Sequence, residues 1–319
     1  MLNKLPPLKK HCSILLLVLL TGFFLSGCNL PAKPAPNAEE NTEKTASFDY
    51  PDHLTDFLDR EVTIEKQPER IVSLSPATTE ILFSLGVGDR LVGVTSYDDY
   101  PPEKVRDLPK VGDFQGPNIE AILAQQPDLI FASRLSGKDQ MDALHNAGFT
   151  VVVLEAASFE QIFDSIRLTA RITNTTATGD QLIGAMQKEI NAVQEKVQDL
   201  PRVNTFYLVD ASGNWTAGKN TFIDELITLA GGENIAGEVT GWVQYSLETV
   251  LEKNPAVILT APHAGKIEEI KQTTGFKETE AVKNNRIYTI SDDNIISRPS
   301  DRIVQGLKEI ANLLHPAAF

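Results

Sequence analysis

Residues 70–83, RIVSLSPATTEILF, place a short strand directly before a helix. The strand is the β-branched run of residues 70–74. Hydroxyl side chains at the start of the helix can cap it, and Glu80 lies in its first turn. Gly86 follows the apolar Leu85 and can end the helix. A strand joined to a helix in this way is the building unit of α/β proteins.

Strands and helices alternate on both sides of this unit. Before residue 158 we expect strands at 60–64, 70–74, 91–94, 128–132 and 150–154, with helices at 118–125 and 140–146. After residue 200 we expect strands at 203–209, 256–260 and 286–290, with helices at 222–230, 246–253, 266–273 and 298–314. The stretch between them is helical throughout, apart from an interruption at 173–178. The pattern predicts an α/β fold of two lobes, each with a central, mostly parallel sheet flanked by helices, joined by a single long bridging helix.

The expected organisation along the chain therefore has five parts. These are a signal peptide (1–27), a disordered tether (28–47), an N-terminal α/β lobe (48–157), a bridging helical segment (158–200) and a C-terminal α/β lobe (201–319). Lobes joined by one rigid helix should move little against each other. A ligand would bind in the cleft between them, outside the carboxyl ends of the strands.

The N-terminus resembles a bacterial lipoprotein signal. Three lysines precede an apolar run at residues 14–25, which is too short to cross a membrane but fits a secretory signal. Ser26 and Gly27 come just before Cys28, as in a lipobox, which implies cleavage before Cys28 and acylation of its thiol. The alternative is an ordinary signal with an incidental cysteine. The segment that follows is rich in Pro, Ala, Asn and Glu, so it cannot bury apolar surface.

Charge and cysteine content exclude several classes of protein. The formal net charge is −14, and removal of the signal makes it more negative because the signal holds three lysines and no acid. This balance argues against a nucleic-acid partner and against attraction to an anionic membrane surface. The second cysteine, Cys12, lies inside the signal, so we expect no disulfide in the mature chain.

Four stretches in order resemble a known family. They are residues 70–83, LVGVTSYDDYPP at 91–102, VGDFQGPNIE at 111–120 and QPDLI at 126–130. Together they are similar to the helical-backbone (class III) substrate-binding proteins of ABC importers for vitamin B12, siderophores and haem, and most similar to the cobalamin-binding branch. The resemblance covers roughly residues 48–316. It implies two lobes bridged by a helix, with a shallow cleft between them.

The resemblance also implies ligand contacts. Tyr97 matches the aromatic residue that packs on the corrin, Phe114 lies where that branch often has a tryptophan, and Trp242 matches a cleft-facing tryptophan. Trp215 either lines the cleft or covers the edge of its lobe. The loop before the last helix aligns with a ligand-contacting loop; it consists of Asn294, Ile295, Ile296, Ser297 and Arg298. This loop departs from the family pattern, which often has an acid and aromatic residues there.

Two acidic residues occupy matching places in the two lobes. Glu120 starts the helix after Asn118, and Glu248 starts the helix after Ser246. In the family, such a pair forms salt bridges to arginines on the two permease subunits, and one charge on each lobe would fix the orientation on a two-fold transporter. The alternative is that each carboxylate only complements its helix dipole.

Other functions find less support in the residues. A metal receptor needs several converging ligands, but the histidines His53, His145, His263 and His315 are widely spaced. A ferric siderophore receptor would use cleft cations, for which Arg298 and Arg134 are the candidates, and a haem receptor would use axial ligands. A secreted enzyme is disfavoured because no nucleophile elbow or phosphate-binding loop is present.

The sequence thus predicts a non-catalytic, lipid-anchored receptor at the outer face of the cytoplasmic membrane. It would carry cobalamin or a related corrinoid to an ABC permease dimer with its ATPase subunits, with no metal site or cofactor of its own. A ferric siderophore or haem receptor of the same fold is the alternative.

Overall fold

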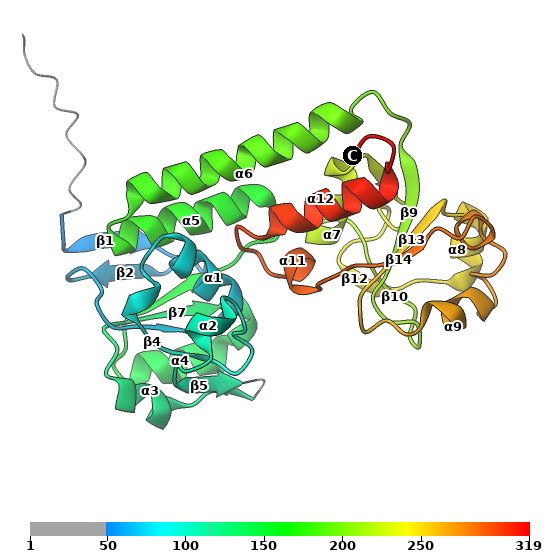
Figure 1. Cartoon of the computed structure of the whole chain (residues 1–319). Helices are drawn as coiled ribbons and strands as arrows, with labels where there is room; N and C mark the ends of the chain where they lie inside the picture. The colour runs from blue at the N-terminus through cyan, green and yellow to red at the C-terminus, as the bar shows by residue number, and fades with distance from the viewer. Residues whose placement is uncertain (1–48, 114) are drawn as a thin grey trace, which may run out of the picture. The chain divides into compact units, whose positions relative to one another are not determined.

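The computed structural model describes residues 49–113 and 115–319 (Figure 1). The expected signal peptide, the tether, Cys28 and Phe114 lie outside the described residues. Residues 49–157 are called the first lobe, and residues 201–319 are called the second lobe. Among the described residues, no helix is both long and apolar enough to cross a membrane.

The first lobe is built on a six-stranded sheet of order β6-β5-β4-β3-β7-β8. Its strands are β3 (Ile71–Ser73), β4 (Leu91–Thr95), β5 (Lys110–Asp113), β6 (Gly116–Pro117), β7 (Leu129–Ser133) and β8 (Val151–Leu154). All neighbours are parallel except β5 and β6. Its helices are α1 (Pro76–Ser84), α2 (Pro102–Val105), α3 (Ile119–Gln125) and α4 (Lys138–Asn146). A separate antiparallel pair, β1 (Asp52–Thr55) and β2 (Glu61–Ile64), precedes this sheet.

The second lobe has a four-stranded parallel sheet of order β11-β9-β13-β14. Its strands are β9 (Val203–Leu208), β11 (Gly232–Asn234), β13 (Val257–Thr260) and β14 (Ile287–Thr289). A second, antiparallel pair consists of β10 (Trp215–Ala217) and β12 (Trp242–Gln244). The helices are α7 (Phe222–Leu229), α8 (Leu247–Lys253), α9 (Ile267–Gln272), α10 (Glu280–Lys283), α11 (Asn294–Ser297) and α12 (Ile303–Leu314).

Two helices connect the lobes: α5 (Phe159–Thr173) and α6 (Thr176–Val197). The Ser158 side chain caps α5, and Asn174 ends it in the left-handed conformation, with φ of 59°. The 22-residue α6 then packs along α5 and against α12 (Figure 1). Buried residues of α1, α5, α6, α7 and α12 belong to one core cluster. The predicted fold class, with two mostly parallel sheets and a long connecting helix, is confirmed.

The predicted final helix is wrong at its start. Residues 298–314 were expected to be one helix, but α11 ends at Ser297, and α12 begins only at Ile303. Arg298 has extended backbone, with φ of −91° and ψ of 121°. The residue before a proline is sterically excluded from the helical region, and Pro299 imposes this on Arg298. Around this interruption, the side chains of Arg298, Ser300, Asp301 and Arg302 form hydrogen bonds to residues of the first lobe.

The structure also contains an internal repeat. Residues 118–132, NIEAILAQQPDLIFA, and residues 246–260, SLETVLEKNPAVILT, each form a capped helix followed by a buried strand. Both helices have seven residues and end at a left-handed residue, Gln126 in α3 and Asn254 in α8. Corresponding positions of the two lobes can therefore be compared residue by residue.

Candidate ligand-binding cleft

A cavity of about 460 Å³ lies between the lobes. The first lobe contributes the start of α1 and the carboxyl ends of β7 and β8, where ligands of parallel α/β sheets bind. The second lobe contributes the start of α7, Trp242 and the segment after α11. The larger apolar residues that line the cavity are Pro76, Ile81, Leu154, Phe222, Trp242 and Pro299. The charged residues that line it are Glu155 and Arg298.

A second cavity of about 250 Å³ adjoins the first one in the first lobe. The two share Ser75, Pro76 and Ser133 in their walls. Tyr97, which the sequence analysis singled out, lines the second cavity and is half-buried. The structure therefore brings Tyr97 and Trp242 to neighbouring cavities, although they come from different lobes.

Both tryptophans of the chain lie on the β10–β12 pair, which is not among the strands expected from the sequence. Trp215 pairs with Gln244, and Ala217 pairs with Trp242, so both indole side chains project from the same face of the two strands. Trp242 is 54% exposed and Trp215 is 41% exposed. Only Trp242 belongs to the wall of the inter-lobe cavity, whereas Trp215 lines neither of the two cavities.

The predicted ligand-contacting loop falls into two groups of residues. Ser297 and Arg298 line the inter-lobe cavity. Asn294 donates a hydrogen bond to Asp99 Oδ2 at 3.2 Å and does not line the cavity. Ile295 and Ile296 are 6% and 0% exposed and belong to the core cluster that contains α12. The expectation that these two isoleucines contact ligand is corrected, because their side chains are packed inside the second lobe.

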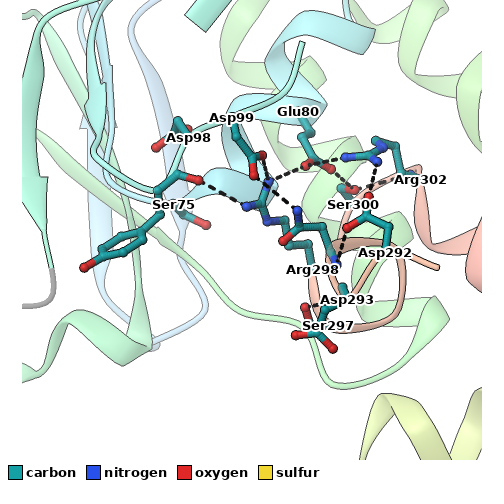
Figure 2. Close-up of polar contacts among 12 residues, drawn as sticks. Ser75, Glu80, Asp98, Asp99, Asp292, Asp293, Ser297, Arg298, Ser300 and Arg302 are labelled. Carbon is teal, nitrogen blue, oxygen red and sulfur yellow. Dashed lines mark hydrogen bonds and ion pairs between the residues drawn. The ribbon is translucent and has the colours of Figure 1, made fainter. Parts of the chain in front are cut away.

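An ion-pair cluster joins the two lobes at the edge of the cavity (Figure 2). Its centre is Glu80 of α1, whose side chain is 1% exposed. Glu80 Oε1 accepts hydrogen bonds from Arg298 Nη1 at 2.9 Å and from Arg302 Nη1 at 3.1 Å. Glu80 Oε2 accepts one from the Ser300 hydroxyl at 2.5 Å. One carboxylate of the first lobe thus binds three side chains of the second.

Two further acids complete this cluster. Arg298 also donates to Asp99 Oδ1 at 2.6 Å and to the Tyr97 carbonyl oxygen at 3.1 Å. Arg302 Nη2 donates to Asp292 Oδ2 at 3.0 Å. We call Glu80, Asp99, Asp292, Arg298 and Arg302 the inter-lobe cluster. Sequence reasoning placed Glu80 only in a first helical turn and did not find this role.

The surroundings of the cluster shift several pKa values. Burial opposes the positive charge of Arg298, but hydrogen bonds to Asp99 and Glu80 outweigh it, so the pKa of Arg298 lies above its ordinary value. Burial raises the pKa of Asp293, and the nearby Asp292 carboxylate raises it further. Burial also raises the pKa of Asp301, whose Oδ2 accepts a hydrogen bond from Ser84 of the first lobe at 3.0 Å. Burial is thus the largest cause of the raised pKa of both aspartates.

The two acids considered for docking lie on the repeated helices. Glu120 of α3 and Glu248 of α8 are both exposed, and neither forms an ion pair with a described residue. Three residues further along each helix lies an exposed leucine, Leu123 at 51% and Leu251 at 41%. Each lobe therefore presents a carboxylate and a leucine on one helix surface, since residues three apart are neighbours there.

The remaining residues that were considered as metal ligands or as cations of the cleft do not lie together in one site. Among residues 49–113 and 115–319, no three histidine, cysteine or acidic side chains are grouped so that they could hold a metal ion. Arg134 lies outside the wall of the inter-lobe cavity and donates a hydrogen bond to the Phe57 carbonyl oxygen at 3.0 Å.

Comparison with known proteins places the chain in a family. The periplasmic binding protein family model matches residues 71–294. The uncharacterized ABC transporter substrate-binding lipoprotein YvrC of Bacillus subtilis (strain 168) is 33% identical over 98% of this chain and 99% of its own length. A vitamin B12-binding protein of Salmonella choleraesuis (strain SC-B67) is 33% identical over 77% of this chain and 90% of its own length.

A solved structure shares the fold as well. The periplasmic haem-binding protein RhuT of Roseiflexus sp. RS-1, in its apo form, superposes with a TM-score of 0.71 at 28% identity, covering 79% of this chain and 99% of that one. The region that the family model matches, residues 71–294, spans both sheets and the helices between them. The chain belongs to the periplasmic binding protein family.

Proposed function

We propose that this chain is the substrate-binding protein of an ABC importer and that it binds a corrinoid, cobalamin or a close relative, in the inter-lobe cleft. The observation that carries the proposal is the cavity between the lobes, which has Trp242 in its wall and whose lining arginine is already paired with acids. The similarity to YvrC and to the vitamin B12-binding protein supports the transport role.

The chemistry of the cleft suits a corrinoid. A corrin presents an apolar face and a rim of neutral amides, so it needs an aromatic or aliphatic surface and a few hydrogen-bonding groups. Trp242, Phe222 and Leu154 provide such a surface, and Tyr97 lies at the adjoining cavity. A corrinoid is larger than either cavity, so it would lie across both and protrude from the cleft.

A ferric siderophore or haem is the second candidate, and the similarity to a haem-binding protein favours it. Haem carries two carboxylates, and many siderophores are anionic, so these ligands bind best beside unpaired cations. The cationic lining residue here is Arg298, and it is held by Glu80 and Asp99. We therefore rank the corrinoid first.

The colour of the purified protein tests the proposal directly. Protein isolated from cells grown with added vitamin should carry the visible absorption bands of a corrinoid. Haem and ferric siderophores absorb differently, so one spectrum separates the three ligand classes. A haem or ferric-siderophore spectrum from cells supplied with all three ligands would contradict the proposal.

Truncation of the cleft tryptophan should weaken ligand binding. We expect Trp242→Ala to lose about 2 kcal/mol of binding free energy, roughly a thirtyfold rise in Kd, because an aromatic side chain packed on a ligand acts as a hot spot. Trp215→Ala is the matched control, since this residue lies on the paired strand but lines neither cavity. Calorimetric titration measures both variants. Equal losses, or none in Trp242→Ala, would place the ligand elsewhere.

We also propose that α3 and α8 dock on the two permease subunits through Glu120 and Glu248. Their exposure at equivalent positions of the repeat supports this role, and the adjacent Leu123 and Leu251 would add an apolar contact on each side. A pair of like sites, one on each lobe, suits a partner with two-fold symmetry. The partner surface would carry a basic side chain beside an apolar pocket in each subunit.

The double variant Glu120→Ala/Glu248→Ala should therefore lower cellular uptake at least tenfold while leaving ligand affinity unchanged. Uptake of radiolabelled ligand and calorimetry measure the two quantities. The matched control is Glu103→Ala/Glu233→Ala, which removes one exposed acid from each lobe on α2 and β11, outside the two proposed docking helices. A fall in ligand affinity of the first variant would assign the acids to the binding site, and equal uptake by both variants would contradict docking.

Finally, we propose that Cys28 carries lipid and holds the protein at the outer face of the cytoplasmic membrane. The lipobox-like residues before Cys28 support this location, as does the similarity to a substrate-binding lipoprotein. The chain from Cys28 to the first lobe would then serve as the tether that lets the protein reach its permease.

A further inference from the structure

The cation in the cavity wall is the feature that carries a further inference. Arg298 lines the inter-lobe cavity, and its side chain is 13% exposed. Its Nη1 atom lies between two carboxylates, 2.9 Å from Glu80 Oε1 and 2.6 Å from Asp99 Oδ1. Its Nη2 atom donates to the Tyr97 carbonyl oxygen. Three of the five N–H groups of this guanidinium, both on Nη1 and one on Nη2, thus donate to the protein before any ligand arrives.

The acidic side chains around Arg298 outnumber the basic ones. In the inter-lobe cluster, the carboxylates of Glu80, Asp99 and Asp292 outnumber the guanidinium groups of Arg298 and Arg302. Glu155 adds another acidic side chain to the cavity wall itself. The cavity wall and the inter-lobe cluster taken together are therefore negative, with four carboxylates to two guanidinium groups. Low-dielectric surroundings strengthen the effect of that charge.

We propose that Glu80 and Asp99 determine ligand specificity: by pairing with Arg298 they keep it from a ligand carboxylate, so that the cleft rejects cargo with rim carboxylates and admits cargo with a neutral amide rim. This inference rests on the proposed function and deepens it. A carboxylate that binds Arg298 through Nη1 would have to displace Asp99 or Glu80. Either displacement leaves an acid without its partner in a partly buried site, which is costly.

Glu80 and Asp99 differ in how much they contribute to folding. Glu80 is almost fully buried and binds three side chains of the second lobe, so its removal also disturbs the fold. Asp99 is 57% exposed and touches Arg298 and Asn294. Asp99→Asn therefore unmasks Arg298 with the least effect on folding. Asp292→Asn is the matched control, because Asp292 pairs with Arg302, which does not line the cavity.

The test compares ligands that differ only in charge. The full-length protein, purified in detergent, is titrated with cyanocobalamin and with the cyanocobalamin derivative in which one rim amide is hydrolysed to a carboxylate. We expect the native protein to bind the amide form at least tenfold more tightly than the carboxylate form. Asp99→Asn should reduce this ratio at least threefold, and Asp292→Asn should leave it unchanged. Circular dichroism and melting temperatures confirm that the variants are folded.

Three results would overturn the inference: no discrimination by the native protein, the same ratio in Asp99→Asn as in the native protein, or an equal change in Asp292→Asn. Haemin and its dimethyl ester form a second pair that differs only in carboxylate charge. If the native protein binds neither corrinoid but binds the ester better than haemin, and Asp99→Asn reverses that order, the proposed ligand is wrong while the charge selection stands. If the corrinoids bind without discrimination, the proposed ligand stands and the charge selection is wrong.

Discussion

Replacement of Glu80 by alanine is expected to lower the free energy of unfolding by about 3–5 kcal/mol, because it leaves buried arginines without their common partner. Arg298 and Arg302 have side chains that are 13% and 10% exposed, so water reaches them poorly once the carboxylate is gone. The Ser300 hydroxyl, fully buried, loses its acceptor as well. Urea unfolding followed by circular dichroism measures the loss.

The control for this variant lies in the same cluster. Asp99→Asn removes a carboxylate from Arg298 at a position that is 57% exposed, where ion pairs contribute about 0–1 kcal/mol. We expect its unfolding midpoint to stay close to that of the native protein. If Glu80→Ala cost no more than Asp99→Asn, the inter-lobe cluster would not be what ties residues 298–302 to the first lobe.

Gly306→Ala should be the second most damaging change, with an expected loss of about 3 kcal/mol of stability from overpacking. Gly306 lies in α12, where an added Cβ atom would come within 2.3 Å of the Ile295 carbonyl oxygen and 2.7 Å of Ile296 Cγ2. The first neighbour is backbone and cannot rotate away, so α11 and α12 would have to separate. That separation would also displace Arg298, which follows α11 directly.

Gly184 of α6 offers the matched control. A Cβ atom there meets nothing within 4 Å, and its backbone is helical, so Gly184→Ala should stabilise the protein by about 0.5–1 kcal/mol. Thermal unfolding of the two variants side by side gives the comparison. If both variants shifted the melting temperature in the same direction, the close approach of α11 and α12 would not be what excludes a side chain at residue 306.

The sequence was sufficient to predict most of the fold because its signals are local. Hydrophobic runs such as 150–154 identify buried strands, and the apolar spacing in 158–197 identifies the long helices. The β10–β12 pair was missed for the opposite reason. Each of β10 and β12 has three residues, and their pairing depends on a partner more than twenty positions away.

The candidate site could be predicted only in part. Tyr97, Trp242, Ser297 and Arg298 were placed by resemblance, and the structure locates them at the two adjoining cavities. The link from Glu80 to Arg298 and Arg302 spans 218 and 222 positions, so no local pattern could reveal it. Resemblance also placed Ile295 and Ile296 in the site, although both side chains are buried in the core. A matching loop position does not tell which way a side chain points.

Calorimetric titration of the purified protein with cyanocobalamin is the most direct test of the corrinoid assignment. We predict saturable binding of one equivalent with a Kd in the nanomolar range, which corresponds to a binding free energy of about −12 kcal/mol. The absence of heat with cyanocobalamin, together with saturable binding of haemin or a ferric siderophore under the same conditions, would contradict the corrinoid assignment.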